Sequence, residues 1–442
     1  MKMKKLLALA LVAIMAITFL VACDNGDNGA ENAANGDNET ENVVTDDNDT
    51  EDAVDEGSGA EDEANEDNGT EDVVNEDNGV AGVTADNVLI GVVHIGPLAD
   101  QGFTYNHDLG FRTMIENLGL REDQYVPKFD VGTDAAAVTA AINELIQEGC
   151  HIIFATSFSH GFQMVEVAAN HPDVVFVHAT GFLAHTYEGN NFHNHFSRIH
   201  EARYLAGIAA GLRTETNVLG YVAAHPFAEV ISGYTAFFLG ARSVNPDVTM
   251  EVIYINAWGN PPEEQLVAAR LIELGADVIA QHSDSATPAL AAEEHGAWHI
   301  GYNNDMRDAA PNASLMSPRI DWSIFYTLAV DNFLNGRPIP IDWAGGLYEG
   351  AAFITELNDA IVAPGTREAL DEAIAEIIAG TRHIFSGVLI DVDGNYAQIT
   401  DSEGNVLYTF DSDSSRWDES DAANRQSAPQ FNAILEGINI IS

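Results

Sequence analysis

The sequence is poor in cysteine and in positive charge. Its 442 residues include 2 Cys, and 18 Lys and Arg stand against 69 Asp and Glu, which gives a formal net charge of −51. Two cysteines can form at most one disulfide bond, so a fold held together by a disulfide framework is excluded. Phosphate contacts need clustered Lys and Arg, so we expect no nucleic-acid partner. Apolar residues make up 46% of the chain, which is ample for a core, and the length allows about two or three domains.

Long apolar runs are also scarce. The run over residues 6–20 follows three lysines at positions 2, 4 and 5. It is shorter than the about 20 residues that span a bilayer, so residues 1–22 are predicted to be a secretory signal peptide. The signal ends in Leu20-Val21-Ala22-Cys23, which resembles the lipobox of bacterial lipoproteins. The resemblance implies that Cys23 is lipidated and holds the mature protein on the extracytoplasmic face of the cell membrane. An ordinary signal peptide with a chance cysteine is the alternative.

The next segment, residues 23–80, is strongly acidic. Residues 24–80 contain 22 acidic side chains and no basic one. Such a composition cannot bury enough apolar surface to offset its ordering entropy, and its like charges repel one another. We therefore expect a disordered tether. A calcium loop is less consistent with the sequence, because the terminal Glu pattern and the flanking helices are absent.

From residue 88 onward, apolar strand patterns alternate with helical patterns. Residues 88–95, 218–223 and 278–281 are examples of continuous apolar runs, and helical spacing recurs between them. Buried strands separated by helices are typical of parallel sheets covered on both faces. The predicted strands are too many for one sheet. The expected fold class is therefore α/β with two lobes, each a doubly wound parallel sheet flanked by helices, and with a cleft at the carboxyl ends of the strands.

The expected division of the chain has three parts. Residues 88–196 and 304–320 form the first lobe, and residues 197–303 and 321–390 form the second. Residues 391–442 form a C-terminal hairpin and docking segment, because Asp393-Gly394-Asn395 and Glu403-Gly404-Asn405 are turn signals.

Several stretches of this body resemble one known family. They are residues 90–104 (IGVVHIGPLADQGFT), 154–158 (FATSF), 203–207 (RYLAG), 240–246 (GARSVNP), 276–282 (ADVIAQH) and 343–347 (WAGGL). Together they resemble the basic-membrane-protein family, bacterial lipoproteins that serve as substrate-binding components of ABC importers for purine nucleosides or related compounds. The resemblance implies the type I periplasmic-binding-protein fold, a membrane permease as partner and no cofactor. We also expect a monomer without enzymatic activity.

A planar aromatic ligand needs flat faces to stack on and polar groups to read its edge. Phe103 and Trp258 follow predicted strands of opposite lobes, and by the resemblance they sandwich the purine ring. A core role is the alternative for both. Asp100 is the leading candidate for edge recognition, since a carboxylate accepts two hydrogen bonds, although it could equally cap a helix.

Four further residues are weaker candidates for ligand contacts, and two other positions depart from the family pattern. The four are Asn106, Ser157, Phe158 and Asp284. By the resemblance, the nucleoside-binding members have an aspartate that binds the ribose at the position of Asn303, and a lysine near the position of Pro318. Because both are replaced here, we favour a purine base such as adenine over a nucleoside.

Other classes of protein remain as alternatives. His178, His185, His193, His195 and His200 fall within 23 residues, and this cluster could make the protein a zinc receptor. A ligand-sensing lipoprotein that signals to a membrane sensor is a second alternative. An enzyme is disfavoured because no nucleophile elbow or phosphate-binding loop is present, and Cys150 lies in an apolar stretch.

Overall fold

The computed structural model describes residues 82–419 and 426–441. The predicted signal peptide, the lipidation site at Cys23 and the acidic tether over residues 23–80 lie outside the described residues.

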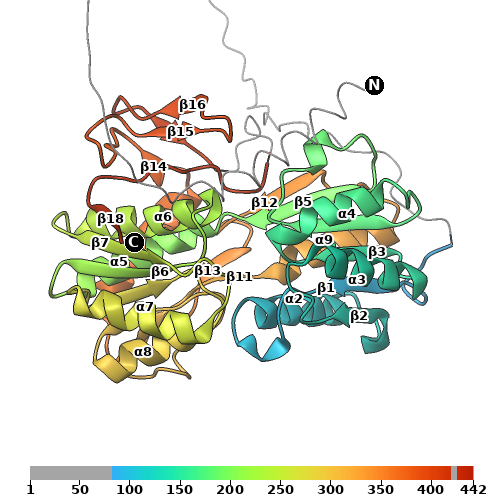
Figure 1. The fold of residues 1–442 in the computed structure, drawn as a ribbon, viewed down its shortest axis with the longest axis horizontal. Coiled ribbons are helices and arrows are strands. Elements are labelled where there is room, and N and C mark those ends of the chain that lie inside the picture. The colour runs from blue at the N-terminus through green and yellow to red at the C-terminus, as the bar shows by residue number, and fades with distance from the viewer. Residues whose placement is uncertain (1–81, 420–425, 442) are drawn as a thin grey trace, which may run out of the picture. The chain divides into compact units, whose positions relative to one another are not determined.

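The first sheet has six parallel strands in the order β12-β5-β4-β3-β1-β2. β1, β3, β4 and β5 are buried along their whole length. β1 and β3 are continuously apolar, as expected for central parallel strands, whereas β4 includes one histidine and β5 has the sequence FHNHFS. The strands are β1 (Ile90–Val93), β2 (Tyr125–Lys128), β3 (Ile152–Ala155), β4 (Val175–Ala179), β5 (Phe192–Ser197) and β12 (Asp342–Gly345). The helices that accompany this sheet are α2 (Phe103–Asn117), α3 (Ala135–Gln147), α4 (Gly161–Ala168) and α9 (Trp322–Leu334). We call this sheet with its helices the first lobe (Figure 1).

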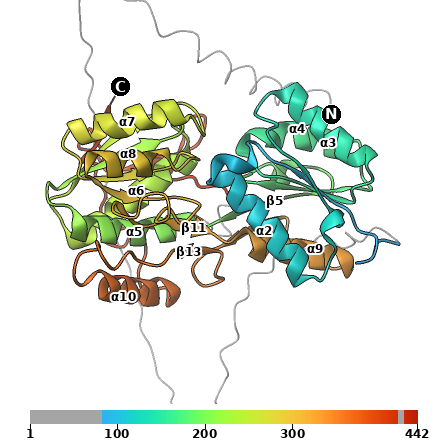
Figure 2. The same cartoon turned by 90° about the horizontal axis from the view of Figure 1, so that it is seen from below.

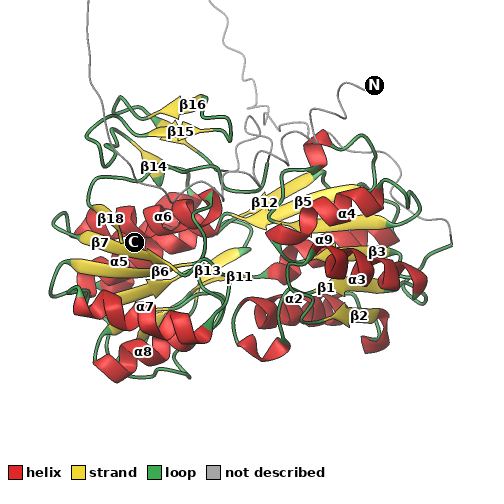
Figure 3. Cartoon of the chain, viewed as in Figure 1, coloured by secondary structure: helices red, strands yellow, loops and turns green. Residues whose placement is uncertain are grey.

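The second sheet also has six parallel strands, in the order β10-β9-β8-β6-β7-β18. The strands are β6 (Val218–Ala223), β7 (Thr249–Tyr254), β8 (Val278–Gln281), β9 (Trp298–Ile300), β10 (Ser314–Met316) and β18 (Ile438–Ile441). The helices are α5 (Ile199–Arg213), α6 (Ala228–Val244), α7 (Pro261–Glu273), α8 (Thr287–His295) and α10 (Thr366–Ile378). We call this sheet with its helices the second lobe, and Figure 3 shows its strands in yellow between red helices.

Short elements complete the described chain. The 3-10 helices are η1 (Leu98–Asp100), η2 (Glu122–Gln124), η3 (Phe158–His160) and η4 (Ala184–Thr186). β11 (Pro318–Ile320) and β13 (Ala352–Ile354) form an antiparallel pair on the path between the lobes. The C-terminal region holds the antiparallel pairs of β14 (Phe385–Ser386) with β17 (Arg416–Trp417), and of β15 (Gln398–Thr400) with β16 (Val406–Thr409). The turn at residues 403–405 joins β15 to β16.

The structure differs from the expected division at two places. Helix α9 and strand β12 belong to the first lobe, because α9 packs against α2 and β12 pairs with β5 (Figure 2). The sequence assigned both to the second lobe within 321–390. Conversely, β10 lies in the second sheet, whereas residues 304–320 were assigned to the first lobe. An apolar stripe predicts that a helix packs on a sheet, but it does not identify which sheet.

Candidate functional site

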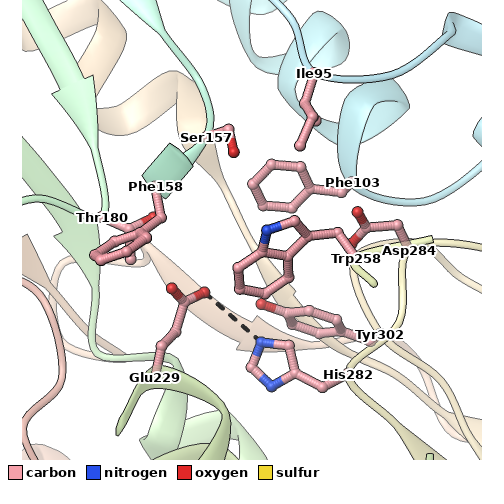
Figure 4. A pocket seen from close by; sticks show the side chains of 10 residues that line it. All are labelled: Ile95, Phe103, Ser157, Phe158, Thr180, Glu229, Trp258, His282, Asp284 and Tyr302. Carbon is pink, nitrogen blue, oxygen red and sulfur yellow. Dashed lines mark ion pairs between the residues drawn. The ribbon is translucent and has the colours of Figure 1, made fainter. Parts of the chain in front are cut away.

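A pocket lies between the carboxyl ends of the two sheets. It is lined by five residues from each lobe (Figure 4). The first lobe contributes Ile95, Phe103, Ser157, Phe158 and Thr180, and the second contributes Glu229, Trp258, His282, Asp284 and Tyr302. In doubly wound sheets this edge is where ligands bind, because loops and helix starts gather there. The pocket therefore occupies the position that the predicted cleft should have.

The two predicted aromatic residues are brought to this pocket from opposite lobes. The ring of Phe103 packs edge-on against the ring of His107 at a centroid distance of 4.4 Å. The ring of Trp258 packs in the same manner against His225 at 5.0 Å. These neighbours fix the orientation of both rings, and the pocket can offer an aromatic surface from each lobe.

Ser157, Phe158 and Asp284 also line the pocket. Ser157 caps η3 by accepting a hydrogen bond from the backbone N–H of Ser159 at 3.3 Å. Phe158 lies across the cleft from Phe227, with ring centroids 5.9 Å apart. Three of the weaker sequence candidates thus share one site.

Asp100 has a different set of contacts. Its carboxylate oxygens accept hydrogen bonds from the backbone N–H groups of Gly102, Thr104 and Tyr105, at 3.0, 2.8 and 3.0 Å. It is not among the ten residues that line the pocket. Asp100 therefore holds the start of α2, which is the capping role weighed as the alternative.

Asn106 and Asn303 lie away from the pocket lining. The side chain of Asn106 donates to the carbonyl of Ile320 at 3.0 Å and accepts from Nε of Arg319 at 2.9 Å. Asn303 is fully buried, its backbone φ is 63°, and its side-chain atoms have no hydrogen-bond partner among the described residues. Asn106 therefore contacts β11 through its side chain, and Asn303 contacts the same strand through its backbone N–H, which donates to the carbonyl of Pro318 at 3.1 Å.

The lobes touch at the rim of the pocket. A Cβ atom built on Gly102 would lie 1.6 Å from the carbonyl oxygen of Asp284. Only glycine allows this approach, so the structure represents a form in which the cleft is closed at this point.

Two carboxyl groups line the pocket, Glu229 and Asp284, and both are partly buried. Burial raises the pKa of Glu229 to about 8, against the opposing effect of Arg203. Burial also raises the pKa of Asp284 well above its usual value, and the neighbouring acids Asp100, Glu264 and Glu229 raise it further. Neither group is easily ionised in this setting.

The histidine cluster does not form a metal site. His178 contacts the carbonyl of Ser157 through Nε2 at 2.8 Å, and His193 contacts the carbonyl of Pro340 through Nδ1 at 3.0 Å. The ring of His195 stacks on Phe325 at 4.4 Å. Within residues 82–419 and 426–441, no group of three or more His, Cys, Asp or Glu side chains could hold a metal ion.

Sequence reasoning missed five lining residues, namely Ile95, Thr180, Glu229, His282 and Tyr302. His282 and Thr180 directly follow β8 and β4, so the rule that cleft residues follow strands could have found them. Glu229 lies in the first turn of α6, and helix starts at this edge also face the cleft.

Solved structures of similar architecture support the fold class. A solute-binding protein of an ABC transporter from Conexibacter woesei matches with a TM-score of 0.56 at 16% identity, covering 67% of this chain and 98% of its own. A second one, from Aeropyrum pernix, matches with a TM-score of 0.58 at 16% identity, covering 66% and 92%. The predicted fold class is thus confirmed: two parallel six-stranded sheets in the type I periplasmic-binding-protein arrangement.

The family follows from the sequence comparisons. Residues 87–382 match the model of the Bmp family, described as "ABC transporter substrate-binding protein PnrA-like". The chain belongs to this family, as the resemblance implied, and is a substrate-binding protein of an ABC transporter.

Two curated relatives are named for different ligands. A purine-binding protein of Brucella abortus is 32% identical over 70% of this chain and 86% of its own length. A putative ABC transporter glucose-binding protein of Haloferax volcanii is 36% identical over 60% of this chain and 66% of its own length, so the chain spans slightly less than two thirds of it.

The described part of the chain gives one further observation on membranes. None of the helices within residues 82–419 and 426–441 has both the length and the apolar character needed to cross a bilayer.

Proposed function

We propose that this protein is a lipid-anchored, extracytoplasmic receptor that binds a purine base in the cleft and presents it to a membrane permease. The observation that carries the proposal is that Phe103 and Trp258 come from opposite lobes and line one pocket. A planar ring held between two aromatic surfaces contacts both lobes at once. Such a ligand stabilises the closed form over the open one, and the closed form is what a permease recognises.

The lining of the pocket supports a neutral ligand. Among its ten residues are two carboxyl groups, three hydroxyl groups and no Lys or Arg. A phosphate or carboxylate on the ligand would face Glu229 and Asp284 without a partner. A base with ring nitrogens and amino groups fits the same surface, and the protein acts as a monomer in this scheme.

The choice of a base over a nucleoside rests on Asn303 and Pro318. Asn303 replaces an acid of the nucleoside-binding members, is fully buried and does not line the pocket. Pro318 offers no side-chain donor. The named function of the Brucella relative, purine binding, supports the same ligand class.

A sugar is the second candidate, because the Haloferax relative is named for glucose. Aromatic surfaces and carboxylates also suit sugar rings, so the lining alone does not distinguish the two classes.

The deciding experiment begins with the full chain purified under native conditions. The protein is denatured, and the small molecules that it releases are identified by mass spectrometry. We expect a purine base. Thermal-shift titrations with adenine, adenosine, guanosine, glucose and zinc on the same sample provide the comparison. Stabilisation by glucose or by zinc without stabilisation by any purine would refute the proposal.

The aromatic contacts have their own test. Trp258→Ala should weaken purine binding by about tenfold or more, because stacking is worth about 1–3 kcal/mol per base. Phe162→Ala is the control, since Phe162 is 42% exposed on α4 and does not line the pocket. Unchanged affinity in Trp258→Ala would place the ligand elsewhere.

A further inference from the structure

Glu229 is the polar side chain of the second lobe that points most directly toward the aromatic surfaces. Figure 4 shows its carboxyl group directed into the pocket, below Phe158 and beside Trp258. Its Oε1 lies 3.7 Å from Nε2 of His282, and 11% of its side chain is exposed. This separation is too long for a good hydrogen bond, so the carboxyl group keeps its capacity for a ligand.

The groups that face Glu229 are His282 and Asp284 after β8, Tyr302 after β9 and Arg203 on α5. Arg203 is fully buried, and its guanidinium carbon lies 3.7 Å from the centroid of the Tyr302 ring. One of its nitrogens, Nη1, donates to the carbonyl of Gln281 at 2.6 Å. Arg203 therefore sits behind Tyr302 and does not line the pocket.

This arrangement disfavours a charged Glu229. Only 11% of its side chain is exposed, and the nearby cation Arg203 stacks on Tyr302 and donates to the carbonyl of Gln281. Burial favours the neutral form of a carboxyl group. The raised pKa of about 8 agrees with this geometry. A neutral carboxyl group has one O–H donor and a carbonyl acceptor side by side.

We propose that Glu229 recognises the ligand as a neutral carboxylic acid, pairing through its O–H and C=O with a ring edge that carries an acceptor nitrogen beside an N–H donor. The edge of a 6-aminopurine such as adenine has this pattern. The same logic lets a glutamine amide read adenine through two hydrogen bonds. Guanine carries the same combination at its C6=O and N1–H, so a neutral carboxyl group accepts purines with an adjacent acceptor and donor and does not by itself separate adenine from guanine. This inference rests on the proposed function, because it requires a purine in the cleft.

The test uses the full chain and titration calorimetry with adenine from pH 6 to pH 9. The wild type should bind adenine at pH 7. Its affinity for adenine should fall about tenfold per pH unit once Glu229 ionises, above pH about 8. Glu229→Gln keeps one donor beside one acceptor, so it should bind adenine within about threefold of wild type at pH 7 and lose the alkaline decline.

Two further variants sharpen the result. Glu229→Leu removes both hydrogen bonds and should weaken adenine binding by tenfold or more. Glu294→Gln is the matched control, an exposed acid on α8 in the same lobe, and it should match wild type at every pH.

Three outcomes would overturn the inference. If Glu229→Gln loses as much affinity as Glu229→Leu, Glu229 acts as an ionised carboxylate that accepts two hydrogen bonds from the ligand. If Glu229→Leu binds normally while Trp258→Ala does not, Glu229 does not touch the ligand, and the proposed function still stands. If the wild type binds no purine, the proposed function fails and this inference fails with it.

Discussion

Glu264 accepts a hydrogen bond from the hydroxyl of Ser285 at 2.5 Å, and this contact joins the two loops that carry Trp258 and Asp284. The same carboxylate accepts from the hydroxyl of Ser283 at 3.1 Å and from the backbone N–H of Asn260 at 2.8 Å. The backbone N–H of Asp284 also donates to the carbonyl of Trp258 at 2.9 Å. The second-lobe side of the pocket is thus held by one fully buried acid.

Removing this acid should destabilise the fold and loosen the site together. Glu264→Ala leaves the hydroxyls and the N–H without their acceptor, at a cost of about 2–4 kcal/mol in the free energy of unfolding. Denaturant titration measures that cost, and ligand titration should show weaker binding. Glu263→Ala, one residue earlier in the same helix, should change stability by less than about 0.5 kcal/mol. Equal effects of the two variants would contradict the role given to Glu264.

The contact between Gly102 and Asp284 predicts a closure defect. Gly102→Ala places a methyl group against a backbone carbonyl of the opposite lobe, so the cleft cannot close fully. Ligand affinity should fall about tenfold or more, while the free energy of unfolding of the ligand-free protein should change little, because the open form has no such clash.

Gly259→Ala is the control for this variant. A Cβ at position 259 would lie 3.6 Å from Cβ of Asp284, an ordinary contact. Scattering measurements with and without ligand should show compaction in the wild type and in Gly259→Ala, and reduced compaction in Gly102→Ala. Full compaction in Gly102→Ala would show that the contact is not needed.

Buried histidines predict sensitivity to acid. Burial lowers the pKa of His94 and His200 to about 3, and that of His160, His178 and His193 to about 4. In the unfolded chain histidine has a pKa of about 6.5. Below that pH the unfolded state binds more protons than the folded state, so stability falls as the pH drops from about 6.5 toward about 4, by up to about 1.4 kcal/mol per pH unit for each histidine.

Urea titrations at pH 7, 6 and 5 check this expectation. His193→Gln should reduce the slope of stability against pH, since it removes one such group. His295→Gln, at an exposed position in α8, should leave the slope unchanged. Constant stability from pH 7 to pH 5 would contradict the assignment of these histidines as neutral in the fold.

The proposed anchor can be tested through its cysteine. Cys23→Ser removes the thiol that would carry the lipid, so the protein should move from the membrane fraction to the soluble fraction of the cell envelope. Cys150→Ser is the control, because Cys150 is buried in the first lobe and should not affect membrane attachment. Metabolic labelling with a fatty acid gives a second readout. Retention of Cys23→Ser in the membrane fraction would reject the lipidation site.

Much of the fold follows from local pattern. The predicted strands at 218–223 and 278–281 coincide with β6 and β8, since continuous apolar runs are typical of central parallel strands. The placement of α9 and β12 did not follow, because the choice of sheet depends on contacts distant in the sequence. Among the site residues, Phe103 and Trp258 could be predicted because they follow predicted strands of opposite lobes and because of the family resemblance. Glu229 could not be predicted, because the sequence around it does not distinguish it from the many other acidic residues of this chain.

The interleaving of the lobes has a consequence for biosynthesis. The first sheet is completed by β12 at residues 342–345, and the second by β18 at residues 438–441, close to the C-terminal end of the chain. Each sheet lacks one of its six strands until most of the polypeptide has been made. Contacts between residues so far apart in the sequence also form slowly. Late completion of both sheets is compatible with the proposed export route, in which the chain crosses the membrane unfolded.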